Sequence, residues 1–185
     1  MRLFVGIEFS EEVVDELLKV QNQIKSEAKR GRFVVQSNLH LTLQFLGEVS
    51  EERLGPIEQA LRKTAQRSRE FSLELKNVGS FGSGQSFRVI WVGIDGDKQE
   101  LVHLQKDLSI SLDKLGFPRK NRPYKPHITL GRNVEFNGEA SFEEYSESLM
   151  KAPFLVNEIS LIESTVENGK RIYRSLSSFR LSAKH

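Results

Sequence analysis

The chain has 185 residues, of which 38% are hydrophobic, 9% aromatic and 28% charged, values typical of a globular protein and not of a disordered or collagen-like one. It contains no cysteine, which excludes a disulfide scaffold, a thiolate nucleophile and cysteine-based metal sites. The net charge of +2 excludes a protein that coats nucleic acid by bulk charge alone. No apolar run is long enough for a membrane span or a signal-peptide core, so we expect a cytoplasmic protein that does not contact a membrane.

Hydrophobic periodicity predicts strands and helices that alternate along the whole chain. In chain order we predict a strand at 2–9, a helix at 11–29, a strand at 39–46, a helix at 51–67, strands at 71–79 and 87–95, a helix at 98–115, a strand at 127–132, a short helix at 141–150 and strands at 154–164 and 171–180. The Asn168-Gly169 pair between the last two strands is typical of a tight hairpin turn. We therefore expect an α/β (α+β) fold.

Two stretches of the sequence occur twice at a constant offset of 87 residues. The strand segment Leu3–Glu8 matches Ile90–Asp95, and His40–Leu43 matches His127–Leu130. Because both matches share one offset, they indicate a duplicated strand–helix–strand–helix–strand unit.

The duplication predicts one two-lobed domain over residues 1–185, with an internal repeat of approximately 1–86 and 87–185. The two pseudo-symmetric lobes are expected to be mostly antiparallel sheets with helices on their outer faces and a cleft between them. Trp91 occupies the position of Phe4 in the repeat and is expected in the core.

Both copies carry a His-x-Thr tripeptide inside an alternating, strand-like segment. In a shuffled sequence, two of the four histidines would be followed by threonine at this spacing only about three times in a thousand. Residues i and i+2 of a strand share a face, so His40 with Thr42, and His127 with Thr129, are expected to project together. The apolar residues between them are expected to face the core.

Two opposed imidazoles suit displacement at phosphorus, because one can accept a proton from the attacking oxygen while the other donates one to the leaving oxygen. The hydroxyls of Thr42 and Thr129 can donate hydrogen bonds to phosphate oxygens. Arg132 adds a planar cation that suits phosphate. The alternatives are histidines that only satisfy backbone carbonyls and a zinc site, but neither motif has a second histidine or a carboxylate at ligand spacing.

The segments His40–Gly47 (HLTLQFLG) and Tyr124–Arg132 (YKPHITLGR) resemble the two signatures of the 2H phosphoesterase superfamily. More narrowly, the chain is similar to the RNA 2′,3′-cyclic phosphodiesterases, also called 2′-5′ RNA ligase-like proteins. The segments Arg2–Ile7 and Arg88–Gly93 fit the same group, although Phe87 stands where members often have proline.

This resemblance implies metal-independent opening of a 2′,3′-cyclic phosphate on RNA to leave a 2′-phosphomonoester. It also implies that His40 is the proton donor and that His127 is the proton acceptor that activates water. In the family, one lobe holds both termini and the middle of the chain builds the other. The partners implied are RNA with 2′,3′-cyclic phosphate termini or cyclic nucleotides, with no obligate protein partner.

Further substrate contacts are expected near these motifs. The basic stretch 119–125 leads into His127, so Lys125 is expected at the rim of the cleft, on the RNA backbone. Arg88 is a candidate phosphate ligand, and Tyr124 and Phe45 are candidates for stacking on the terminal base.

Two other functions stay open at this point. One is an ATP-independent 2′-5′ RNA ligase that acts on tRNA halves, and the other is a non-catalytic RNA-end binding protein. We find neither an acidic metal cluster nor a glycine-rich phosphate loop in the sequence, and so expect no metal and no cofactor.

Overall fold

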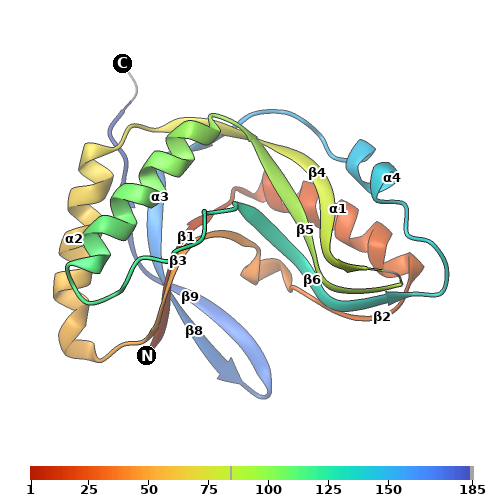
Figure 1. Cartoon of the computed structure of the whole chain (residues 1–185), viewed down its shortest axis with the longest axis horizontal. Coiled ribbons are helices and arrows are strands. Elements are labelled where there is room, and N and C mark those ends of the chain that lie inside the picture. The colour runs from red at the N-terminus through yellow and green to blue at the C-terminus, as the bar shows by residue number, and fades with distance from the viewer. Residues whose placement is uncertain (84, 184–185) are drawn as a thin grey trace.

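The structure is a computed structural model that describes residues 1–83 and 85–183 (Figure 1). Its strands are β1 (Arg2–Glu8), β2 (Ala28–Phe33), β3 (His40–Glu48), β4 (Phe71–Ser83), β5 (Ser86–Gly96), β6 (His127–Phe136), β7 (Phe154–Val156), β8 (Glu158–Glu167) and β9 (Lys170–Arg180). Its α-helices are α1 (Glu11–Glu27), α2 (Leu54–Arg67), α3 (Lys98–Asp113) and α4 (Phe142–Glu147), and short 3₁₀ turns cover Gln36–Asn38 and Glu51–Arg53. Among the described residues, no helix combines the length and the apolar composition that a membrane span requires.

The strands form two sheets in which every neighbouring pair is antiparallel, which confirms the predicted fold class. One sheet has the order β3-β1-β8-β9 and the other has the order β2-β6-β5-β4-β7. The first sheet ends in the predicted hairpin, where Asn168 and Gly169 both have positive φ, as a two-residue turn of this kind requires. Figure 1 shows this hairpin extending away from the rest of the molecule.

Three strands have the same order in both sheets. β1 lies between β3 and β8, and β5 lies between β6 and β4 in the same arrangement. The third strand of each predicted repeat is exchanged, because β4 pairs with β5 of the second half and β8 pairs with β1 of the first. This shared order supports the predicted repeat, which itself stays a prediction.

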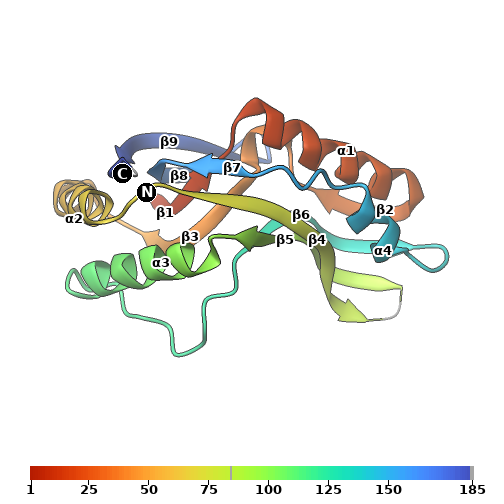
Figure 2. The same ribbon diagram turned by 90° about the horizontal axis from the view of Figure 1, so that it is seen from above.

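Two helices also contact the sheet that does not contain their preceding strand. α1 follows β1 but packs against β2 and β6 of the five-stranded sheet, and α3 follows β5 but contacts β3 of the four-stranded sheet. α2 lies against β8 and β9 and beside α3 (Figures 1 and 2). α1 therefore covers the sheet to which its preceding strand does not belong, whereas α3 contacts a strand of each sheet, β3 and β4.

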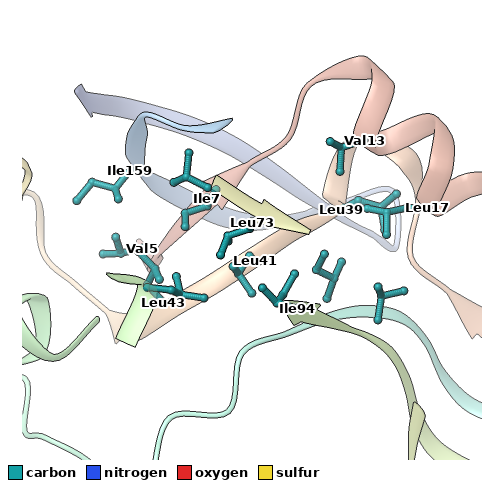
Figure 3. Packing of buried hydrophobic residues seen from close by; sticks show 14 of the residues in the cluster. Val5, Ile7, Val13, Leu17, Leu39, Leu41, Leu43, Leu73, Ile94 and Ile159 are labelled. Carbon is teal, nitrogen blue, oxygen red and sulfur yellow. The ribbon is translucent and has the colours of Figure 1, made fainter. Parts of the chain in front are cut away.

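One hydrophobic core joins the two sheets (Figure 3). Val5, Leu41 and Ile159 of the four-stranded sheet belong to the same buried cluster as Leu73 and Ile94 of the five-stranded sheet. Burial of large aliphatic side chains stabilises a fold by about 1.5–3 kcal/mol for each residue. The core therefore holds the two sheets, and the strands at their facing edges, in a fixed relation.

Three sequence predictions are wrong. The predicted helix at 11–29 ends at Glu27, because the next residues form the charged strand β2. The predicted strand at 154–164 is two strands, since the chain leaves one sheet after Val156 and enters the other at Glu158. Trp91 is only partly buried, whereas Phe4 is in the core.

Candidate functional site

His40 is the first residue of β3, and its ring is held from both sides. Its Nδ1–H donates to the carbonyl oxygen of Asn38 at 2.6 Å, and its Nε2 lies 3.0 Å from Thr42 Oγ1. A carbonyl oxygen can only accept a hydrogen bond, so the proton is on Nδ1 and the lone pair of the neutral ring is on Nε2. Leu41 and Leu43 point to the core, which confirms the predicted alternation of this strand.

His127 opens β6 and repeats the first of these two hydrogen bonds. Its Nδ1–H donates to the carbonyl oxygen of Lys125 at 2.8 Å, and Ile128 and Leu130 are fully buried on the other face. The carbonyl of the residue two positions earlier thus fixes the tautomer of both histidines. In both rings Nε2 is the nitrogen available for proton transfer.

Aromatic side chains that the sequence analysis did not identify pack against both imidazoles. The ring of His40 lies 4.6 Å from that of Phe4 and 5.0 Å, edge to face, from that of Tyr173 on β9. His127 meets Phe81 of β4 at 5.7 Å, also edge to face. These contacts come from strands that are distant in sequence, so no local pattern could have indicated them.

The structure brings the two His-x-Thr strands together. β3 and β6 contact each other although they belong to different sheets. The hydroxyl of Tyr124, just before β6, donates to the carbonyl oxygen of Thr42 at 2.7 Å. Burial raises the pKa of this hydroxyl and so keeps it protonated as a donor. Tyr124 thus ties the basic loop to β3, and a stacking role for its ring stays a prediction.

The electrostatic surroundings of His40 favour its neutral form. Burial lowers its pKa from the ordinary value of 6.5, and the positive charge of Arg132 lowers it further, although the hydrogen bond to the Asn38 carbonyl opposes both. Arg132 thus influences a histidine of the other sheet from its own position on β6.

The remaining predicted substrate residues are on the surface around this site. Arg88, Lys125 and Arg132 are exposed, and the guanidinium of Arg88 lies 5.8 Å from the ring centre of Phe81, the residue that packs on His127. Phe45 is 52% exposed, and its ring lies 5.8 Å from that of Phe4 and 5.9 Å from the ammonium nitrogen of Lys120. The substrate contacts of all four side chains stay predictions.

Trp91 lies directly across from Thr129 in the sheet. Its indole occupies the space where a Cβ at position 79 would lie, so the strand needs glycine there. The ring also packs against Phe81 at 5.6 Å. The partial exposure of Trp91 therefore follows from its place beside the threonine of the second motif.

A pocket of about 240 Å³ opens beside His40. It is lined by Glu8, Phe9, Glu11, Val14, Gln36, Ser37, Leu39, His40, Ile162 and Tyr173. Glu8 lies across from His40 in the sheet, and its carboxylate accepts a hydrogen bond from Ser160 at 3.0 Å. His127 lies instead across from Gly93. The two histidines thus differ in their neighbours, although Nδ1 of each bonds to the backbone carbonyl two residues earlier.

In the described part of the chain, no three His, Cys, Asp or Glu side chains gather at a spacing that could hold a metal ion.

Asn38 connects His40 to the β8–β9 hairpin. Its buried side chain donates from Nδ2 to the carbonyl oxygen of Arg171 at 2.9 Å and accepts from the backbone N–H of Tyr173 at 3.3 Å. Asn38→Ala removes both bonds, so we expect it to lower the free energy of unfolding by about 1–3 kcal/mol, measured by urea denaturation. The exposed Asn137→Ala is the matched control and should stay within about 0.5 kcal/mol of wild type. An Asn38→Ala protein as stable as the control would contradict this role.

Comparison with known proteins agrees with the two motifs. The family model of the 2′-5′ RNA ligase superfamily matches residues 11–168. An RNA 2′,3′-cyclic phosphodiesterase of Methanothermobacter thermautotrophicus is 30% identical over 184 residues, which cover 98% of this chain and 99% of that protein.

Two solved structures are similar over almost the whole chain. The protein TT0787 of Thermus thermophilus covers 100% of both chains with a TM-score of 0.83 and 26% identity. Escherichia coli LigT complexed with 3′-AMP covers 97% of each chain with a TM-score of 0.78 and 31% identity. The resemblance indicated by the two histidine motifs is thereby confirmed, and the chain belongs to the 2′-5′ RNA ligase superfamily.

Proposed function

We propose that this protein hydrolyses RNA 2′,3′-cyclic phosphate ends to 2′-phosphomonoesters by acid–base catalysis with two histidines and no metal. The observation that carries the proposal is the matched pair of imidazoles, each held by a backbone carbonyl so that Nε2 is available. The relative in Methanothermobacter thermautotrophicus, named for this reaction, supports the substrate class.

In this mechanism His127 accepts a proton from water at Nε2 as the water oxygen attacks phosphorus. The bond between phosphorus and the ribose 3′-oxygen breaks, and His40 donates its Nε2 proton to that oxygen. The products are a 2′-phosphate and a 3′-hydroxyl. Thr42, Thr129 and Arg132 hold the non-bridging phosphate oxygens, whose negative charge they can neutralise or hydrogen-bond.

The proton donor must be charged before it can act, and burial opposes that charge on His40. An anionic phosphate next to the ring favours the imidazolium form, because opposite charges at close range raise the pKa of a histidine. The substrate itself therefore supplies the interaction that stabilises the protonated form of His40, the form that can donate a proton.

Product analysis on a short oligonucleotide with a 2′,3′-cyclic phosphate end tests the reaction. In excess EDTA we expect complete conversion to the 2′-phosphomonoester, because the two histidines supply both proton transfers. The same reaction with an added 5′-hydroxyl oligonucleotide reports ligation, since a 2′-5′-linked product would show that the hydroxyl replaces water. Binding of the cyclic end without any conversion would overturn the proposal in favour of an end-binding protein.

A further inference from the structure

The strand β2 brings further positive charge to the sheet that carries His127. It is an edge strand, paired only with β6, and Lys29, Arg30 and Arg32 on it are exposed. Charged residues commonly protect edge strands from aggregation, and this use accounts for a general excess of charge. Protection of the edge does not explain which residue of β6 lies across from each arginine of β2.

Arg30 and Arg32 differ in that partner. Arg30 lies across from Glu135, and its Nε forms an ion pair with that carboxylate at 3.0 Å. Arg32 lies across from Arg132 instead. Cross-strand partners project from the same face with Cβ atoms about 5 Å apart, and like charges in this position destabilise the pair.

No acidic group compensates this repulsion. Within residues 1–83 and 85–183, no carboxylate oxygen lies within 4.0 Å of the guanidinium of Arg32 or of Arg132. Two arginines in cross-strand register without a carboxylate partner suit an anion, because planar cations of this kind bind phosphate oxygens through paired hydrogen bonds.

The position of the pair relates it to the two-histidine site. Arg132 lies on β6, the strand that also carries His127 and Thr129, and the proposed function places its guanidinium on the reacting phosphate. Arg32 is on the strand next to β6, and neighbouring strands lie about 4.8 Å apart in the direction of the sheet hydrogen bonds. Two arginines on neighbouring strands suit two successive phosphates of one RNA strand, one for each guanidinium.

We infer that Arg32 binds the phosphodiester that precedes the terminal cyclic phosphate in an RNA chain. The inference rests on the proposed function and extends it: the site selects an RNA strand over a cyclic mononucleotide, which has no such phosphodiester. Arg132 holds the reacting phosphate, and a chain that crosses β6 towards β2 places its next phosphate at Arg32.

The test compares two substrates in two variants from the same strand. For a trinucleotide with a 2′,3′-cyclic phosphate and for the cyclic mononucleotide, we measure kcat/KM and take the ratio. Arg32→Gln should lower this ratio about tenfold, the size expected for one lost hydrogen bond to a charged group. Arg30→Gln, which removes the arginine paired with Glu135, should leave the ratio unchanged. An unchanged ratio in Arg32→Gln would overturn the inference.

A binding measurement keeps this test independent of turnover. The affinity for a trinucleotide that ends in a 2′-phosphate, measured by fluorescence anisotropy, should fall about tenfold in Arg32→Gln and not in Arg30→Gln. The slope of log affinity against log salt should become shallower by about 0.7, the value for one phosphate contact on a single strand. If wild type hydrolyses neither substrate, the proposed function fails, while the affinities still decide whether Arg32 binds the strand.

Discussion

Replacing either His40 or His127 by alanine should lower kcat/KM for an RNA 2′,3′-cyclic phosphate by about 10²-fold or more. A positioned general acid or base contributes about 10²–10⁴-fold to such a rate, and each imidazole has its Nε2 available for one proton transfer. The measurement is steady-state hydrolysis of the cyclic oligonucleotide at saturating EDTA. The double variant should lose less than the product of the single losses, because the two groups act in one step.

The matched control is His103→Ala on α3, since this histidine is exposed and distant in sequence from both motifs. It should retain wild-type kcat/KM. Unfolding of all three variants by urea separates a lost catalytic group from a lost fold. Activity within about threefold of wild type in a folded His40→Ala or His127→Ala protein would contradict the two-histidine mechanism.

A substrate with sulfur in place of the bridging 3′-oxygen should separate the roles of the two histidines. A thiolate is a much weaker base than an alkoxide, so it leaves without a proton from the enzyme. On this substrate His40→Ala should recover to within about tenfold of wild type, while His127→Ala stays about 10²-fold slower because water still needs its base. A thiol reagent can follow the released 3′-thiol directly, since the protein itself contains no cysteine.

This experiment has two informative alternatives. Recovery of His127→Ala instead of His40→Ala would reverse the assignment of proton donor and proton acceptor. The lowered pKa of His40 without substrate gives a reason to test this reversal. Recovery of neither variant would show that leaving-group protonation is not the task of either imidazole. An exposed-site variant such as His103→Ala should behave like wild type on both substrates.

The strands that carry the site were predictable because their side chains alternate strictly. In β3, buried Leu41 and Leu43 alternate with His40 and Thr42, and β6 repeats this pattern. Both segments have one apolar and one polar face, so periodicity alone indicates strand and orientation. The pairing of the two motifs followed from their shared offset in the sequence.

The parts that the sequence did not reveal depend on tertiary contacts. β2 has the sequence AKRGRF, which lacks any apolar alternation and becomes a strand because β6 offers it a free edge. The break between β7 and β8 falls at a single residue, Asn157, between the apolar run Phe154–Val156 and the alternating strand that begins at Glu158. Whether such a segment forms a strand depends on the strand with which it pairs, and the local sequence pattern does not identify that partner.

Register is a further property that the repeat does not predict. Glu8 and Asp95 are equivalent at the offset of 87, yet Glu8 lies across from His40 while Gly93, not Asp95, lies across from His127. The two copies are therefore shifted by two residues relative to each other. A shift of two keeps every side chain on its own face, so the His-x-Thr faces survive it.

The exchange of β4 and β8 between the sheets has a consequence for the origin of the site. A half-length chain with only β1, β3 and β4 could not complete its own sheet, and it would take its missing strand from a second copy. Such an intertwined homodimer would place one histidine from each subunit about a two-fold axis, and symmetry would force the two imidazoles into identical surroundings. A single chain removes that constraint. His40 is partly buried and lies across from Glu8, whereas His127 lies across from a glycine, so in a single chain with the predicted repeat the two histidines are free to differ.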